Sequence, residues 1–263
     1  MPFTSVPGAQ IYWKQEGPER APALVLLNSI GTDMDLWEPM MPALRERFSV
    51  LRIDARGHGP SSITPGDLSL ADLAGDVLAV ADAAGIARFS LAGVSLGGMV
   101  GMELALAVPQ RLEKLALVCT SATMDAAMWG ARVETVRSKG EGGGMAAIAE
   151  PSLGRFFSEG VRKDNPGLCD GVLRQLLTMD PEGYAGCGAA IRDMDLADRI
   201  GAITCPTLVV TGRQDTSTPL EGHGEHLLAH IPGAAHVAVD AAHLPPLEAP
   251  EALTTALVPF LES

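Results

Sequence analysis

The stretch that decides the fold is Phe89–Gly101, which reads FSLAGVSLGGMVG. An apolar run leads into it, a helical pattern follows it, and a single serine, Ser95, stands among four nearby glycines. An ordinary turn between a strand and a helix needs one glycine or one capping residue. This density of glycine indicates a backbone that closely approaches other parts of the chain and a serine side chain held out from a tight turn.

Residues Gly93–Gly97 match the pattern G-x-S-x-G, with a predicted strand before it and a predicted helix after it. That context is typical of a nucleophile elbow, in which the serine hydroxyl projects above a sheet. The N-terminus of the following helix then favours negative charge developing beside the hydroxyl. The five residues alone also fit a plain strand–turn–helix with incidental small residues, because short motifs arise by chance. Whether Ser95 is a nucleophile therefore depends on whether the chain also supplies a base and an acid that can act with it.

The rest of the chain alternates between apolar runs and helical patterns. Two short segments around Pro7 predict an opening hairpin. The apolar runs are Ala23–Leu27, Val50–Ile53, Phe89–Ala92, Leu115–Val118 and Leu208–Val210. The helical patterns between them are Leu36–Arg47, Leu70–Ala84 and Leu96–Val108, the second preceded by a capping box of Ser69 and Asp72. Runs that are apolar on both faces fit buried parallel strands, so we predict an α/β fold with a mostly parallel, doubly wound sheet.

This rhythm stops after Cys119. Residues 121–196 carry several helical patterns, a run of three glycines and no convincing strand. We predict that they form a helical lid, inserted into a core made of residues 1–120 and 197–263, which excludes bulk water from a pocket at the strand ends. The alternative is a helical excursion that fills one side of the core.

A serine nucleophile needs a base and an acid, in the chain order Ser, Asp or Glu, then His. Asp215 follows the apolar strand TLVVTG, and His243 follows a short apolar strand and precedes a helix near Pro250. Both lie where predicted strands end, so both side chains can converge on Ser95. We predict the triad Ser95, His243 and Asp215, with Asp125 as the rival acid.

The fourth part of such a site is an oxyanion hole. One backbone amide comes from the residue after the nucleophile, Leu96, and the other from the loop after an early strand. In LLNSIGTDMDLW that second residue is Ile30, with Gly31 permitting the sharp turn. The alternative is an ordinary loop in which Asn28 and Ser29 satisfy their own backbone.

These residues resemble the α/β-hydrolase superfamily over nearly the whole chain, which implies the α/β-hydrolase fold with an inserted helical lid. Within it, the NSIGTD…W stretch and the segment Asp180–Leu196, DPEGYAGCGAAIRDMDL, resemble the 3-oxoadipate enol-lactonases of bacterial aromatic catabolism. Many members of the superfamily have His-Gly where this chain has Asn28-Ser29. The enol-lactonases usually carry Ser-Asn where this chain has Pro245-Pro246, a departure that leaves the triad intact and falls on the pocket wall.

The resemblance implies a cofactor-free, metal-free serine hydrolase that converts 3-oxoadipate enol-lactone to 3-oxoadipate. Such a substrate carries a carboxylate, and a protein with 32 acidic and 19 basic residues needs a local cation to bind it. We expect Trp37, Trp129 and Arg192 to contact the substrate. The alternative for Arg192 is a surface ion cluster with Asp193 and Asp195. The other arginines of the predicted lid are Arg132, Arg137, Arg155, Arg162 and Arg174.

Two other activities fit the same triad, a general carboxylesterase and a cofactor-free perhydrolase or haloperoxidase. A third possibility is a protein that binds a ligand on this fold without turnover. The segment from His223 to His230 invites a metal site, but the order HGEH does not match the zinc-protease pattern, and we expect a solvated helix face. We expect His58 to be a loop residue.

Composition narrows the setting. The 263 residues are 47% hydrophobic, enough for a large core, and the net charge of −13 argues against nucleic-acid partners. The four cysteines have no paired or metal-like spacing, which predicts reduced thiols. The N-terminus does not resemble a signal peptide, and no apolar run approaches the roughly 20 residues that span a bilayer. We therefore expect a soluble, cytoplasmic protein with no membrane partner.

Overall fold

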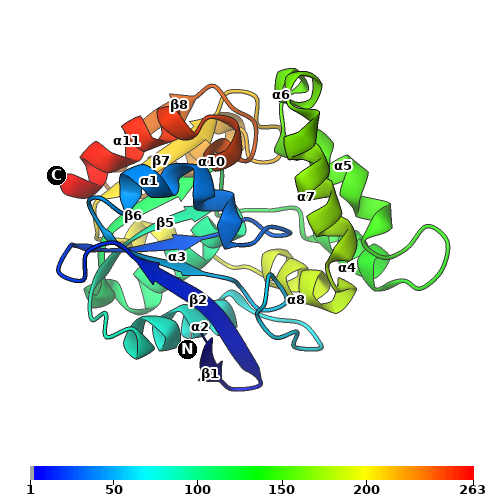
Figure 1. Cartoon of the computed structure of the whole chain (residues 1–263), viewed down its shortest axis with the longest axis horizontal. Helices are drawn as coiled ribbons and strands as arrows, with labels where there is room; N and C mark the ends of the chain where they lie inside the picture. Colours follow the sequence, from blue (N-terminus) through cyan, green and yellow to red (C-terminus); the bar gives the residue numbers. More distant parts are fainter. Residues whose placement is uncertain (1–2) are drawn as a thin grey trace.

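The computed structural model describes residues 3–263, and its centre is a sheet of eight strands in the order β1-β2-β4-β3-β5-β6-β7-β8 (Figure 1). The first two strands run antiparallel to their neighbours, and the other pairs are parallel. The strands are β1 (Phe3–Val6), β2 (Ala9–Glu16), β3 (Ala23–Leu27), β4 (Ser49–Ile53), β5 (Phe89–Val94), β6 (Leu112–Val118), β7 (Thr207–Gly212) and β8 (Ala235–Val239). The predicted hairpin, parallel sheet and α/β-hydrolase fold are confirmed.

The central strands form because their residues are apolar on both faces. Every residue of β4, β5 and β7 is buried. In register, Val25 of β3 lies opposite Leu51 of β4 on one side and Leu91 of β5 on the other. The edge strand β8 is more exposed. The parallel strands therefore end together, and the loops that leave them can share one site.

Helices cover both faces of this sheet. On one face, α2 (Leu70–Ala83) packs beside α3 (Leu96–Ala107); on the other, α1 (Met41–Leu44), α10 (Pro245–Glu248) and α11 (Pro250–Glu262) lie together (Figure 1). The predicted capping box at the start of α2 is present. The short helix α9 (Glu225–His230) follows a kinked turn, η4 (Leu220–Gly224), and two single turns are η2 (Pro109–Arg111) and η3 (Ile200–Ala202).

The helix predicted over Leu36–Arg47 is wrong in detail. The chain forms a 3-10 helix, η1 (Met34–Met40), followed by the single turn of α1. Pro39 lies inside η1, and Pro42 lies in the first turn of α1. Proline has no backbone N–H and crowds the preceding turn, so a continuous α-helix cannot pass through both positions.

Five helices lie between β6 and β7, and Figure 1 shows them grouped beside the core. They are α4 (Ala126–Arg137), α5 (Ala146–Phe156), α6 (Glu159–Asp164), α7 (Pro166–Thr178) and α8 (Pro181–Arg192). We call this group the helical insertion. That it acts as a lid stays a prediction.

The helical insertion meets the core through a backbone contact between two glycines. A Cβ atom added at Gly57 would lie 2.2 Å from the Gly183 Cα, and one added at Gly183 would lie 2.6 Å from the Gly57 Cα. Neither position therefore has room for a side chain. Close by, Arg137 of α4 and Arg192 of α8 both pair with Asp67, which precedes α2.

Two expectations about the whole chain can be compared with the structure. The four cysteines are free; Cys119, Cys169 and Cys187 are buried, and Cys205 is half-buried. Within residues 3–263, no helix has both the length and the apolar character needed to cross a membrane.

Candidate active site

Ser95 occupies a strained turn between β5 and α3. Its backbone has φ 54° and ψ −114°, and among residues 3–263 only Ser95 and Cys119 combine a side chain with positive φ. Such a conformation costs on the order of 1–3 kcal/mol and persists only where the surrounding structure enforces it. Here the Ser95 amide donates to the Val118 carbonyl at 3.0 Å, and the Thr120 hydroxyl donates to the Ser95 carbonyl at 2.6 Å. The end of β6 and the residues that follow it therefore hold the turn at Ser95 in place.

The glycines around Ser95 are explained by close contacts. A Cβ atom at Gly93 would lie 2.3 Å from the backbone of Gly97. One at Gly97 would lie 2.5 Å from the Leu27 carbonyl oxygen, and one at Gly98 would lie 2.6 Å from the Thr120 side chain. The glycines thus allow α3 to begin directly against β3 and β5, which is what the motif predicted.

Asp215 and His243 are brought together from the loops after β7 and β8. The His243 Nδ1 lies 2.9 Å from Asp215 Oδ2, and both side chains are buried. The other carboxylate oxygen accepts from the amides of Ser217 and Thr218, and the Thr218 hydroxyl donates to Oδ2 at 2.8 Å. Burial alone raises the pKa of Asp215, but the charge of His243 and these hydrogen bonds outweigh it and lower the pKa to about 2. Asp215 therefore stays ionised and can orient the imidazole.

The rival acid has a different place. Asp125 is exposed and caps α4, accepting from the Met128 amide at 3.0 Å. It is an ordinary helix cap. The residue paired with His243 is Asp215.

The loop after β3 carries the predicted second oxyanion donor. Within residues 3–263, the amides of Ile30 and Leu96 donate to no other backbone or side-chain group. The neighbouring Gly31 amide donates to His58 Nε2 at 2.9 Å, and His58 Nδ1 lies 3.0 Å from the Arg56 carbonyl. His58 must therefore be neutral, with its proton on Nδ1. Burial agrees with this, because it lowers the pKa of His58 to about 4.

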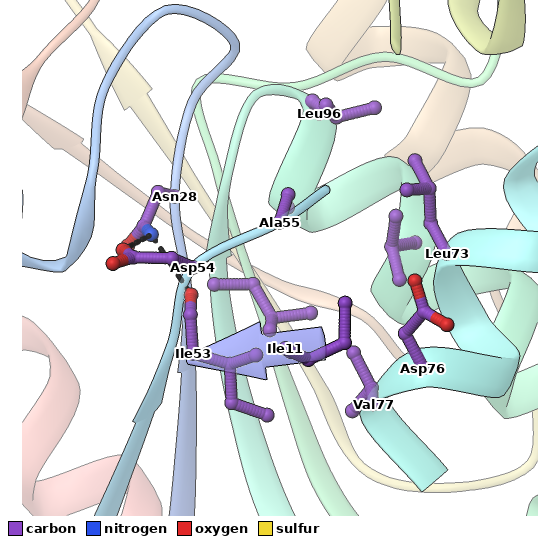
Figure 2. A pocket seen from close by; sticks show the side chains of 12 residues that line it. Ile11, Asn28, Ile53, Asp54, Ala55, Leu73, Asp76, Val77 and Leu96 are labelled. Atoms are coloured by element: carbon purple, nitrogen blue, oxygen red, sulfur yellow. Dashed lines mark hydrogen bonds between the residues drawn. The ribbon is translucent and has the colours of Figure 1, made fainter. Parts of the chain in front are cut away.

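Asn28 joins this loop to the elbow. Its carbonyl accepts from the Gly97 amide at 3.0 Å, while its side-chain Nδ2 donates to the Ile53 carbonyl at 2.9 Å and reaches Asp54 Oδ1 at 3.4 Å (Figure 2). Asp54 Oδ1 also accepts from the Met34 amide. Asn28 Oδ1 and Asp54 Oδ2 are both buried, and neither has a donor among residues 3–263. Burial, reinforced by two nearby carboxylates, raises the pKa of Asp54 to about 7.

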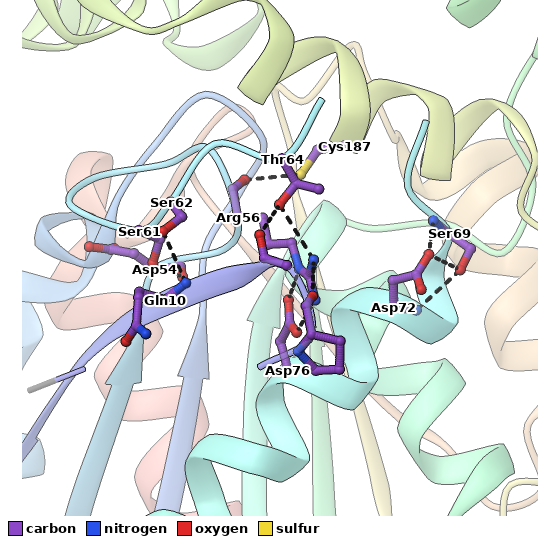
Figure 3. Close-up of polar contacts among 12 residues, drawn as sticks. Gln10, Asp54, Arg56, Ser61, Ser62, Thr64, Ser69, Asp72, Asp76 and Cys187 are labelled. Atoms are coloured by element: carbon purple, nitrogen blue, oxygen red, sulfur yellow. Dashed lines mark hydrogen bonds and ion pairs between the residues drawn. The ribbon is translucent and has the colours of Figure 1, made fainter. Parts of the chain in front are cut away.

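The loop that carries His58 is itself firmly held (Figure 3). Arg56 forms a two-pronged pair with Asp76 of α2, with distances of 2.5 and 2.7 Å. The Ser61 hydroxyl donates to the Asp54 carbonyl, and Cys187 of α8 contacts the Arg56 carbonyl. These contacts fix the support on which the loop of Ile30 and Gly31 rests.

Ser95 and His243 border one cavity of about 140 Å³ between the strand ends and the helical insertion. Within residues 3–263 the Ser95 hydroxyl has no hydrogen-bond partner, so its oxygen is free for a ligand or for His243. The core side of this cavity is lined by Ile30, Ser95, Met99, Thr218 and His243. The helical side is lined by Met128, Trp129, Arg132, Arg155, Phe156 and Tyr184.

Two arginines on the helical side have no acidic partner among residues 3–263. Arg132 donates from Nε to the Tyr184 hydroxyl at 2.7 Å and from Nη2 to the Ser152 hydroxyl at 2.6 Å. Its guanidinium also lies over the rings of Trp129 and Tyr184. Arg155 reaches only the Ser152 hydroxyl, at 3.5 Å. In the described part of the chain neither side chain forms an ion pair with a carboxylate.

Of the three residues expected to bind substrate, only Trp129 lines the cavity. The expectation for Trp37 is wrong, because this side chain is fully buried in the core. The expectation for Arg192 is also wrong: its guanidinium pairs with Asp193 and Asp67 outside the cavity. Those two carboxylates already neutralise it, so it offers no free cation to a substrate.

Sequence reasoning missed several side chains that shape the site. Phe156 stacks on the His243 ring with 6.0 Å between centroids, and Thr218 supports Asp215. Arg132 follows Trp129 by three residues, which places both on one face of a helix. That spacing could have indicated that Arg132 lines the same cavity as Trp129. No pattern in the sequence indicates the position of Arg155, because it depends on how α5 packs.

The chain also contains a group of histidines away from the cavity. His226 and His230 lie on α9 with 4.1 Å between ring centroids, and each contacts a backbone carbonyl. Among residues 3–263, no three His, Cys, Asp or Glu side chains are grouped in a way that could hold a metal ion.

Comparisons with known proteins agree with this architecture. Residues 22–142 match the family model described as the alpha/beta hydrolase fold. The chain is 31% identical to 3-oxoadipate enol-lactonase 2 of Acinetobacter baylyi over 92% of this chain and 89% of that protein. It is 30% identical to the putative carbamate hydrolase RutD of Klebsiella pneumoniae over 76% of each chain. The crystal structure of the enol-lactonase from Burkholderia xenovorans superposes with a TM-score of 0.95, at 34% identity and with full coverage of both chains.

Proposed function

This chain belongs to the α/β-hydrolase family, and on that premise we propose that it is a serine hydrolase that opens a small lactone, 3-oxoadipate enol-lactone, to give 3-oxoadipate. Two relatives named as enol-lactonases match along nearly all of its length, which supports a lactone as the substrate. The residues around the cavity support the chemistry.

In the proposed reaction, the Ser95 oxygen attacks the ring carbonyl while His243 accepts the hydroxyl proton. Asp215 holds the imidazole with its Nδ1 proton facing the carboxylate and stabilises the imidazolium that forms. The amides of Ile30 and Leu96 donate to the oxyanion. Collapse breaks the bond to the ring oxygen, and the enol leaves with the proton from His243 and then becomes a ketone. Water, deprotonated by His243, hydrolyses the acyl-enzyme and restores Ser95.

The observation that carries this proposal is the single cavity that both Ser95 and the His243–Asp215 pair border. A cavity of about 150 Å³ holds benzene, so the 140 Å³ here suit a five-membered ring with a short substituent. The helical insertion covers that ring and limits the water that reaches the acyl-enzyme, which is the role we propose for it as a lid.

A second candidate is hydrolysis of a small carbamate, because a relative with that name matches three quarters of the chain. The same nucleophile, base and oxyanion donors serve both reactions, and the leaving group differs. General esterase and perhydrolase activities also fit the same residues.

A substrate panel separates these activities. Purified protein is offered the enol-lactone, a simple γ-lactone, an aryl acetate and a small carbamate, and halogenation is followed with peroxide present. We expect the highest kcat/KM for the enol-lactone, and labelling of Ser95 by a fluorophosphonate that abolishes the turnover. Preference for the carbamate or the aryl ester would reject the lactonase. An unlabelled Ser95 with no turnover would reject serine catalysis altogether.

A further inference from the structure

The two arginines on the helical side of the cavity differ in how they are held. Arg132 is fixed by two hydrogen bonds of 2.6 and 2.7 Å and by two aromatic faces. Arg155 has one contact at 3.5 Å, although its side chain is half-buried. Ser152 contacts both guanidinium groups, so the two positive charges lie close together. Arg132 is thus a rigid part of the wall, and Arg155 keeps most of its donors free.

Two like charges at one end of a partly dry cavity repel each other, and that repulsion is strong where water is excluded. The pKa of Arg155 shows the effect, since burial and then the charge of Arg132 lower it. An anion placed between the two groups would relieve both costs. No carboxylate of residues 3–263 takes that place, in contrast to Arg192, which has two.

We propose that Arg132 and Arg155 form a carboxylate-binding end of the active-site cavity, so that the substrate is a lactone or ester carrying one free carboxylate. This inference rests on the proposed function, because it assigns the part of the substrate that does not react. Arg155 is the specificity-determining residue, as its free N–H groups match the two oxygens of a carboxylate. Arg132 adds charge from a fixed position.

The placement of the carboxylate relative to the reacting carbonyl follows from α5. Arg155 is followed directly by Phe156, whose ring stacks on His243. The carboxylate end and the base are therefore supported by adjacent residues of one helix. A substrate anchored at Arg155 extends along Phe156 towards Ser95, and a neutral substrate lacks that anchor.

The test compares a carboxylated ligand with its uncharged counterpart. The substrates are a γ-lactone bearing a carboxymethyl group and the corresponding carboxamide. For Arg155→Met we expect KM for the carboxylate to rise about 10- to 100-fold, as for loss of a charge-assisted hydrogen bond, with little change in kcat. The carboxamide should be hydrolysed as before. Arg155→Lys should recover part of the carboxylate preference. Arg162→Met, an exposed arginine of α6, is the matched control and should leave both substrates unaffected.

Binding measured without turnover keeps this test separate from the proposed function. Calorimetry with cyclopentanone-acetate, which carries the carboxylate but has no bond to hydrolyse, and with its amide gives the selectivity directly. We expect Arg155→Met to remove the preference for the carboxylate even if the enzyme proves to act on another ester. Equal weakening of both ligands, or an unchanged preference for the carboxylate, would overturn the assignment while leaving the triad untouched.

Discussion

The core side and the helical side of the cavity are stabilised in opposite ways. On the core side, Asp215 accepts three hydrogen bonds and has an imidazole partner, and Ser95 sits in a turn fixed by the Val118 carbonyl and the Thr120 hydroxyl. On the helical side, Arg132 and Arg155 line the cavity, and neither is paired with a carboxylate in the described part of the chain. The polar groups of Asp215 on the core side therefore already have their partners within the protein. The helical side is incomplete and suits recognition of a particular ligand.

The largest expected effect is on the core side. Ser95→Ala and His243→Ala should each lower kcat by on the order of 10⁶-fold, because the two residues act in one proton transfer. The double variant should lose little more than either single one. Steady-state kinetics on the best substrate of the panel measures this. Losses that multiply would mean that the two residues work independently, and the core side would not be a catalytic unit.

The next effect concerns the acid. Asp215→Asn should cost on the order of 10⁴-fold in kcat, because an amide favours the wrong tautomer of His243. Asp125→Asn keeps a capping oxygen on α4 and should change kcat by no more than about twofold. Kinetics of the pair, with circular dichroism to verify folding, decides between them. A larger loss for Asp125→Asn would place the acid on the helical side.

The third prediction concerns stability on the core side. A folded-state pKa of about 7 lies above the ordinary value of 3.8, so folded Asp54 binds a proton that the unfolded chain releases between these values. The contribution of this proton to the free energy of unfolding is therefore fully present below pH 4 and is lost as the pH rises through 7. The neutral form also avoids a charge beside Asp54 Oδ2, which is buried and has no donor among residues 3–263. Asp54→Asn keeps a neutral polar side chain there at every pH.

Urea unfolding at pH 5 and pH 8 measures this linkage. On going from pH 5 to pH 8, the free energy of unfolding of Asp54→Asn should rise relative to that of the parent by on the order of 3 kcal/mol. Asp54→Ala should also remove the pH dependence, but it deletes the oxygen that accepts from the Met34 amide, so it should be less stable than Asp54→Asn at both pH values. A parent protein whose difference from Asp54→Asn is the same at pH 5 and pH 8 would show that Asp54 is ionised throughout.

The smallest expected effect is on the outer surface of the helical insertion. Arg192→Ala should leave KM for the carboxylated lactone unchanged, and should lower the free energy of unfolding by less than about 1 kcal/mol, since its ion pairs are partly exposed. The comparison is with Arg155→Met under the same conditions. If Arg192→Ala raised KM for the carboxylated substrate alone, the carboxylate would be bound by Arg192, and the assignment to Arg155 would be wrong.

The two sides also differ in what the sequence could predict. The sequence predicts that Ser95, Asp215 and His243 lie near one another, because parallel strands end at one edge and residues that follow different strands meet there. The structure places Ser95 and His243 on one cavity, with Asp215 beside His243. Gly93 and Gly97 were predictable too, because a tight turn at Ser95 leaves no room for side chains at these two positions and the motif shows glycine there. For the helical side, similarity of a sequence stretch favoured Arg192, which lies at the end of α8 and faces Asp67. Which face of α5 or α8 points inward depends on helix–helix packing, and no local pattern encodes it. The same holds for η1, where two prolines outweighed an apolar pattern.

The contact between Gly57 and Gly183 has a consequence for redesign of this protein. Because a side chain at either glycine would clash with the other backbone, the start of α8, next to Tyr184, is held directly against the core loop of Gly57. Engineering a larger or differently charged substrate would start from the lining side chains Met128 of α4 and Arg155 of α5, which are not glycines held in backbone contact. Among descendants of this sequence, new specificities should accumulate at the positions of Met128 and Arg155, while the α8 wall keeps its shape.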